Sequence, residues 1–112
     1  MVAPSVSFSD SVRKALAEAK EELEALYGDR LRKLVVYGSQ ARGDARPDSD
    51  VDLMIILDGQ VDPAKEADRT SELVMRIAGR HSVVLSPLHM SKDEFLEDRP
   101  LPSAARREGV AI

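Results

Sequence analysis

The hydrophobic positions of this 112-residue chain fall into short segments, separated by Gly, Pro and charged residues. Some segments have the spacing of a helix, and others are the continuous apolar runs of a strand. From about residue 9 to residue 27, apolar side chains recur at spacings of four, three, four and three, which predicts an amphipathic helix. The members of this stripe are Val12, Leu16, Ala19, Leu23 and Leu26. Gly28 is placed to end the helix in a left-handed conformation.

A second helix is predicted from Asp62 and Pro63 to about residue 78, because an acid at the N-cap followed by proline is a strong helix start. Its apolar face is expected to consist of Ala64, Ala67, Val74 and Ile77, and Gly79 is expected to stop it. Ser91 and Glu94 fit a capping box for a short helix to about residue 98. A last short helix is predicted over residues 103–108.

Three apolar runs predict strands, over residues 34–37, 51–57 and 82–88. The second run is apolar on both faces, as in a central strand covered on both sides. Pro87 places the third at a sheet edge or a strand end. The alternation of helices and strands indicates an α/β or α+β fold, with a single domain over residues 9–112 and a flexible segment over residues 1–8.

Composition and charge exclude several classes of function. The chain has no cysteine, which rules out disulfides and thiolate metal sites, and no apolar run long enough to span a membrane. No leader-like segment opens it, so a cytoplasmic location is expected. A net charge of −4 argues against binding of long nucleic acid, but not against a small nucleotide whose charge a metal ion offsets.

The candidate chemistry is concentrated in the segment VVYGSQARGDARPDSDVDLMIIL. Gly38 lets a ligand approach the backbone, and amide groups of a helix beginning near Ser39 would point at an anion. Asp50 and Asp52 alternate on a strand, so their carboxylates project to one face and can converge on one cation. Mg²⁺ prefers such oxygen ligands together with substrate phosphates. Arg42, about one helical turn beyond Ser39, is placed to reach a phosphate.

Each part of this constellation has a simpler interpretation. Gly-Ser is a common turn, and an isolated Asp-X-Asp is more often a solvated loop, a calcium-type site or a sugar-nucleotide site. Arg42 could instead pair with Asp44 or Asp48. The combination of both halves at the ends of apolar strands favours a functional site for a nucleoside triphosphate. His81 and His89 have no third ligand at matching spacing and are expected at the surface or at strand ends.

The residues from Gly38 to Gly43 and from Ser49 to Leu53 resemble the signature of the polymerase-β-like nucleotidyltransferase superfamily. The short chain is similar to its minimal nucleotidyltransferase branch, whose members often accompany a HEPN-domain protein as antitoxin to toxin. The resemblance implies a palm-like fold with a small mixed sheet and flanking helices. It also implies Mg²⁺-dependent transfer of a nucleoside monophosphate, with AMP from ATP favoured, to a hydroxyl of the partner protein.

By the same resemblance, Asp50 and Asp52 match the metal-binding acids, and Gly38 and Ser39 match the phosphate-binding pair. Active members commonly carry a third carboxylate on a neighbouring strand. The corresponding segment here, HSVVLSPLH, contains no acid, and Ser82 or Ser86 occupies the place.

Two main hypotheses follow: an enzyme that adenylylates a partner, and a non-catalytic antitoxin that neutralises its partner by contact. A small-molecule transferase would need a further domain to bind its acceptor. A lone strand edge and the apolar C-terminal residues favour association with a partner or a second copy.

Overall fold

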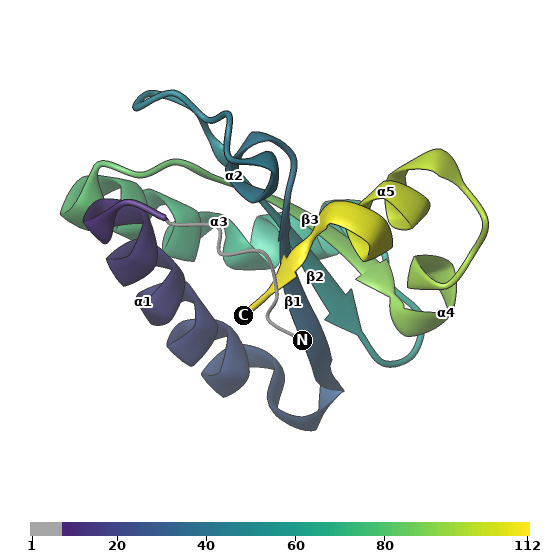
Figure 1. Ribbon diagram of the computed structural model, residues 1–112. Coiled ribbons are helices and arrows are strands. Elements are labelled where there is room, and N and C mark those ends of the chain that lie inside the picture. The colour runs from purple at the N-terminus through teal and green to yellow at the C-terminus, as the bar shows by residue number, and fades with distance from the viewer. Residues whose placement is uncertain (1–7) are drawn as a thin grey trace.

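A computed structural model describes residues 8–112 as a four-stranded mixed sheet with helices on both faces (Figure 1). The sheet order is β3-β2-β1-β4; β2 and β3 are parallel, whereas β1 is antiparallel to both β2 and β4. The elements in chain order are α1 (Asp10–Tyr27), the 3₁₀ turn η1 (Gly28–Arg30), β1 (Leu31–Tyr37), α2 (Ser39–Arg42), β2 (Val51–Leu57), α3 (Pro63–His81), β3 (Leu85–Ser91), α4 (Lys92–Phe95), α5 (Pro100–Glu108) and β4 (Val110–Ala111). The predicted mixed α/β fold is confirmed.

Helices α1 and α3 cover one face of the sheet, and α4 and α5 cover the other (Figure 1). The larger core lies under α1 and α3 and takes alternate residues of the strands, including Leu34, Val36, Leu53, Ile55 and Leu57. The smaller core, under α4 and α5, takes the residues between them, including Val35, Met54 and Ile56. This division confirms β2 as a central strand that is apolar on both faces.

Helix α1 begins as predicted, with the Ser9 hydroxyl accepting a hydrogen bond from the Val12 amide at 3.2 Å. The predicted stripe is buried as far as Leu23, but Leu26 is 43% exposed and Tyr27 is buried instead. The reason is the reach of the Tyr27 ring, which extends to α3 and β3. The Tyr27 hydroxyl donates a 2.7 Å hydrogen bond to Glu66, and the Tyr27 and His89 rings lie in a T-shaped arrangement with centroids 6.3 Å apart.

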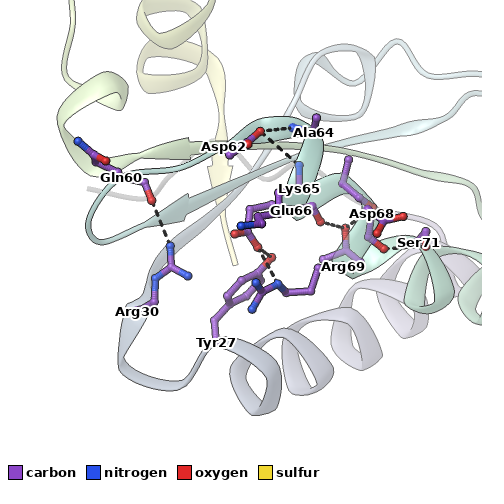
Figure 2. Close-up of polar contacts among 12 residues, drawn as sticks. Tyr27, Arg30, Gln60, Asp62, Ala64, Lys65, Glu66, Asp68, Arg69 and Ser71 are labelled. Carbon is purple, nitrogen blue, oxygen red and sulfur yellow. Dashed lines mark hydrogen bonds and ion pairs between the residues drawn. The ribbon is translucent and has the colours of Figure 1, made fainter.

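The predicted apolar face of α3 is wrong in the first half of the helix. Ala64 and Ala67 are exposed, and the helix buries Glu66, Thr70, Leu73 and Ile77. Glu66 tolerates burial because the Tyr27 hydroxyl and the Arg69 guanidinium both contact its carboxylate (Figure 2). The helix also continues through Gly79 to His81 and ends at Ser82, whose φ is 55°.

His89 is the buried histidine of the fold, so its expected surface or strand-end position is wrong. It lies on β3 opposite Ile55 and is 3% exposed, and Nε2 has no hydrogen-bond partner among residues 8–112. Burial lowers the pKa of His89, and the negative charge of Glu66 opposes this effect. His81, by contrast, lies at the end of α3 and pairs with Glu18 at 3.0 Å.

The C-terminal third contains the largest departures from prediction. Strand β3 lies at the sheet edge, as Pro87 indicated, but runs over Leu85–Ser91. The Ser91 capping box is confirmed. Helix α5 begins at Pro100, because proline is tolerated in a first turn. Val110 and Ala111, two of the apolar C-terminal residues, form β4, which pairs with the edge of β1 that faces away from β2. The association expected of these residues stays a prediction.

The predicted flexible segment falls almost wholly outside the described residues; its last residue, Phe8, packs half-buried against the larger core. Over residues 8–112, no helix is both long enough and apolar enough to cross a membrane.

Candidate functional site

The site begins where β1 ends. Gly38 follows Tyr37 with φ 73° and ψ −147°, a conformation that residues with a Cβ rarely adopt. The turn leads directly into α2, and the Arg42 amide donates a 3.0 Å hydrogen bond to the Gly38 carbonyl. Gly43 ends α2 in the left-handed region. The short helix considered after Gly38 is therefore present, and it is one turn long.

Asp52 lies beside this turn because β1 and β2 pair with Tyr37 opposite Asp52. A Cβ added to Gly38 would lie 2.4 Å from Oδ2 of Asp52, which is closer than atoms can approach. Glycine is thus required at position 38 both for its backbone conformation and for the space that the Asp52 carboxylate occupies. The fold therefore brings the Gly-Ser turn and Asp52 together.

The electrostatics of Asp52 suit a bound cation. Partial burial raises the pKa of Asp52, the charge of Asp50 raises it further, and the charge of Arg42 opposes both. Asp50 itself is exposed and directly precedes β2. Two carboxylates that repel each other, with oxygen as their only donor atoms, match the ligand preference of Mg²⁺. The residues present therefore fit this metal ion.

A cavity of about 360 Å³ opens beside Asp52 and joins the turn to α5. Its walls are Tyr37, Gly38, Ser39, Arg42, Asp52, Leu101, Ala104, Ala105 and Glu108. Burial raises the pKa of Tyr37, and the nearby Asp52 charge adds to that shift. Sequence reasoning missed the four lining residues from α5, because no local pattern links them to a turn more than 60 positions earlier.

Arg42 pairs with Asp44, one of the two acids that the sequence analysis considered for it. It lines the same cavity as Asp52 and lowers the pKa of that carboxyl, while its Nε lies 3.4 Å from Oδ2 of Asp44. The Asp44 pair is exposed, so it holds the guanidinium only weakly. Arg42 can therefore leave Asp44 for a phosphate at small cost.

Ser86 occupies the strand position next to the acids. The parallel ladder pairs Asp52 with Ser86, whereas Ser82 ends α3 and lies before β3 begins. Of the two serines considered, Ser86 is therefore the neighbour of Asp52. Within residues 8–112, no three His, Asp or Glu side chains are grouped closely enough to hold a metal ion together.

Comparison with known proteins identifies the family. The model of the nucleotidyltransferase domain family matches residues 16–102. A candidate protein adenylyltransferase of Methanocaldococcus jannaschii is 32% identical over 82 residues, which span 73% of this chain and 76% of the relative. This chain is a minimal nucleotidyltransferase of the polymerase-β-like superfamily.

Solved structures agree with this assignment. A candidate minimal nucleotidyltransferase superimposes with a TM-score of 0.56 at 30% identity, covering 95% of this chain and 99% of the other. A toxin–antitoxin structure with AMP-PNP gives a TM-score of 0.57 at 18% identity, covering 84% and 70%, and supports the fold. The predicted superfamily, fold and enzyme class of this minimal nucleotidyltransferase are confirmed.

Proposed function

We propose that this minimal nucleotidyltransferase transfers AMP from ATP to a hydroxyl of a partner protein, in a reaction that depends on Mg²⁺. The observation that carries the proposal is the close approach of the Asp52 carboxylate to Gly38, in a cavity that Ser39 and Arg42 also line. Phosphates placed on the Gly38-Ser39 turn would lie directly beside the Asp52 carboxylate.

Each residue has a role that follows from its position. Gly38 lets the triphosphate approach the backbone, and Ser39 offers an amide and a hydroxyl to phosphate oxygens. Arg42, held only by an exposed pair with Asp44, binds phosphate charge. Asp50 and Asp52 hold the metal, which when bound neutralises phosphate charge and orients the reacting oxygens.

The comparisons support a protein as the acceptor. The Methanocaldococcus relative is described as a candidate protein adenylyltransferase, and the AMP-PNP structure is a toxin–antitoxin pair. We therefore propose that the acceptor is a HEPN-domain toxin and that this chain acts as its antitoxin in the cytoplasm. Covalent attachment of AMP would silence the toxin.

The test is incubation of the wild type with a purified HEPN-domain protein encoded by a neighbouring gene, Mg²⁺ and ATP labelled at the α-phosphate. Label on the partner is expected with the wild type and its loss with the double variant Asp50→Asn/Asp52→Asn. A matched control is Asp68→Asn, which removes an exposed acid on α3. Equal labelling by the wild type and the double variant would overturn the proposal.

A second function, neutralisation by contact without turnover, is favoured by one observation: Ser86, rather than an acid, pairs with Asp52 on β3. This alternative requires that the double Asp variant still protects cells from the partner. Loss of protection with unchanged partner binding would exclude it in favour of catalysis.

A further inference from the structure

The candidate site has an acid on each side of β1. On one side, Asp52 of β2 lies opposite Tyr37. On the other, the β1–β4 ladder pairs Val35 with Ala111 and Val36 with Val110. Gly109 connects this ladder to α5, whose last residue is Glu108. Glu108 thus approaches the phosphate turn from the flank opposite to Asp52, and it lines the same cavity.

Glu108 is held in place by the packing of the residue that follows it. A Cβ on Gly109 would lie 2.3 Å from the Ala105 carbonyl oxygen and 2.3 Å from Cγ1 of Val35. The end of α5 therefore packs directly against β1. In Figure 1, α5 is the yellow helix that leads into β4. This packing restricts the position of the Glu108 backbone.

The position of Glu108 has no evident structural benefit. It is the last residue of α5, where the helix dipole disfavours a negative charge. Its contact with Arg107 is 4.0 Å, the outer limit of an ion pair, and the carboxylate side chain remains 42% exposed. It also faces a cavity that already contains the Asp52 carboxylate. An acid that lies at an unfavourable position beside a proposed active site is a candidate catalytic residue.

We propose that Glu108 is the general base of the transfer reaction, and this inference rests on the proposed function above. The acceptor hydroxyl oxygen forms a bond to the α-phosphorus, and the bond from that phosphorus to the bridging oxygen of pyrophosphate breaks. Pyrophosphate leaves with the electron pair, and the hydroxyl proton passes to the Glu108 carboxylate. In-line displacement places the attacking and leaving oxygens on opposite sides of phosphorus, and acids on both flanks of Gly38 suit that geometry.

The acceptor is a better partner for Glu108 than a metal ion is. Residues 8–112 hold no group of three acids or histidines arranged around one point. Glu108 instead stands beside the apolar wall of Leu101 and Ala104, where the segment carrying the acceptor hydroxyl can enter the cavity. Glu108 of α5 thus takes the role of the acid that is missing from β3.

The experiment compares the wild type with Glu108→Gln, Glu108→Asp and the control Glu21→Gln, an exposed change on α1 across the sheet. Transfer of α-labelled AMP to the HEPN-domain partner is followed in a single turnover, AMP-PNP affinity is measured separately, and thermal midpoints are recorded. Glu108→Gln is expected to slow transfer about 10²–10⁴-fold. AMP-PNP affinity should stay unchanged and the midpoint should be equal or higher. Glu108→Asp should recover part of the rate, and Glu21→Gln should match the wild type.

Four outcomes would overturn the assignment of Glu108 as the base. Transfer by Glu108→Gln at the wild-type rate, with loss of transfer in Asp50→Asn/Asp52→Asn, would remove Glu108 and leave the proposed function standing. A weakened AMP-PNP affinity would make Glu108 a binding residue, and a lowered midpoint would make it a structural one. Absence of transfer by the wild type would instead overturn the proposed function, and this inference with it.

Discussion

Gly38 and Asp52 lie so close that one added carbon on Gly38 would stand 2.4 Å from Oδ2 of Asp52. The contact joins the end of β1 to the beginning of β2, where Tyr37 pairs with Asp52. It brings the phosphate-binding turn and the metal-binding acid of the proposed mechanism together without any intervening side chain.

The first prediction concerns this contact. Gly38→Ala should abolish AMP transfer, because the new Cβ displaces the Asp52 carboxylate, and the φ of 73° adds backbone strain of about 1–3 kcal/mol. Gly59→Ala is the control, since Gly59 has φ 81° but nothing within 4 Å of an added Cβ. That variant should lose stability in chemical denaturation and retain transfer. Full transfer by Gly38→Ala would contradict the geometry.

Asp52→Asn should raise the thermal midpoint in the absence of divalent cations. Burial and the Asp50 charge raise the pKa of Asp52, so its contribution to stability is present at acidic pH and is lost as the pH rises through the folded-state pKa. At neutral pH the ionised carboxylate therefore destabilises the fold. Adding Mg²⁺ should raise the midpoint of the wild type but not that of Asp52→Asn. A metal-induced rise of equal size in both would exclude Asp52 as a ligand.

Tyr27→Phe should lower the free energy of unfolding by about 1–3 kcal/mol, because buried Glu66 loses the hydroxyl that donates to it. Glu66→Gln is the matched variant, since its amide oxygen can still accept that hydrogen bond, and it should cost less. Both are measured by urea denaturation. Transfer should be unaffected in both variants, because Tyr27 precedes the start of β1 and the proposed site lies at its end. A loss in Glu66→Gln as large as that in Tyr27→Phe would contradict the assignment of the loss to this hydrogen bond.

His89 should make the protein sensitive to mild acid. Burial lowers its folded-state pKa below the ordinary value of 6.5, so the unfolded chain binds a proton first as the pH falls. Stability is therefore complete above about pH 6.5 and declines between that value and the lower folded-state pKa. The difference in unfolding free energy between pH 7.5 and pH 5.5 should be smaller in His89→Leu than in the wild type. Identical differences would show that His89 does not titrate in this window.

Gly109→Ala should loosen the junction of α5 and β4, because a Cβ would collide with the Ala105 carbonyl and Val35. We expect a lower thermal midpoint and faster amide exchange at Val110, with reduced transfer if Glu108 is the base. Gly79→Ala provides a control of opposite sign, since Gly79 lies within α3 with open space around it. That change should stabilise the protein by about 0.5–1 kcal/mol. Unchanged exchange at Val110 would argue against the close packing.

Local sequence patterns were sufficient to predict the elements that carry the site residues. The strand over residues 51–57 is predicted to the residue, since its apolar run is bounded by an acid pair and a turn. The caps at Asp62 and Ser91 are also confirmed, because capping is decided by two or three neighbouring residues. Gly38 before a helical turn belongs to the same class of short-range signal.

Partners distant in the sequence explain the failures. The buried face of α3 includes Glu66 because Tyr27, 39 residues earlier, satisfies its carboxylate. His89 is buried because Tyr27 and α3 cover that end of β3. Strand β4 is two residues long and has no pattern of its own, so only its pairing with β1 defines it.

The sequence alone determined the family, the order of most elements, and the acids and glycine proposed to handle metal and phosphate. These depend on residue types at short spacing, where backbone preference and hydrogen bonding act locally. Only the tertiary structure decided that Ser86 neighbours Asp52 and that Glu108 reaches the same cavity from α5. Strand register and helix packing set those positions, and both arise from contacts between segments far apart in the chain.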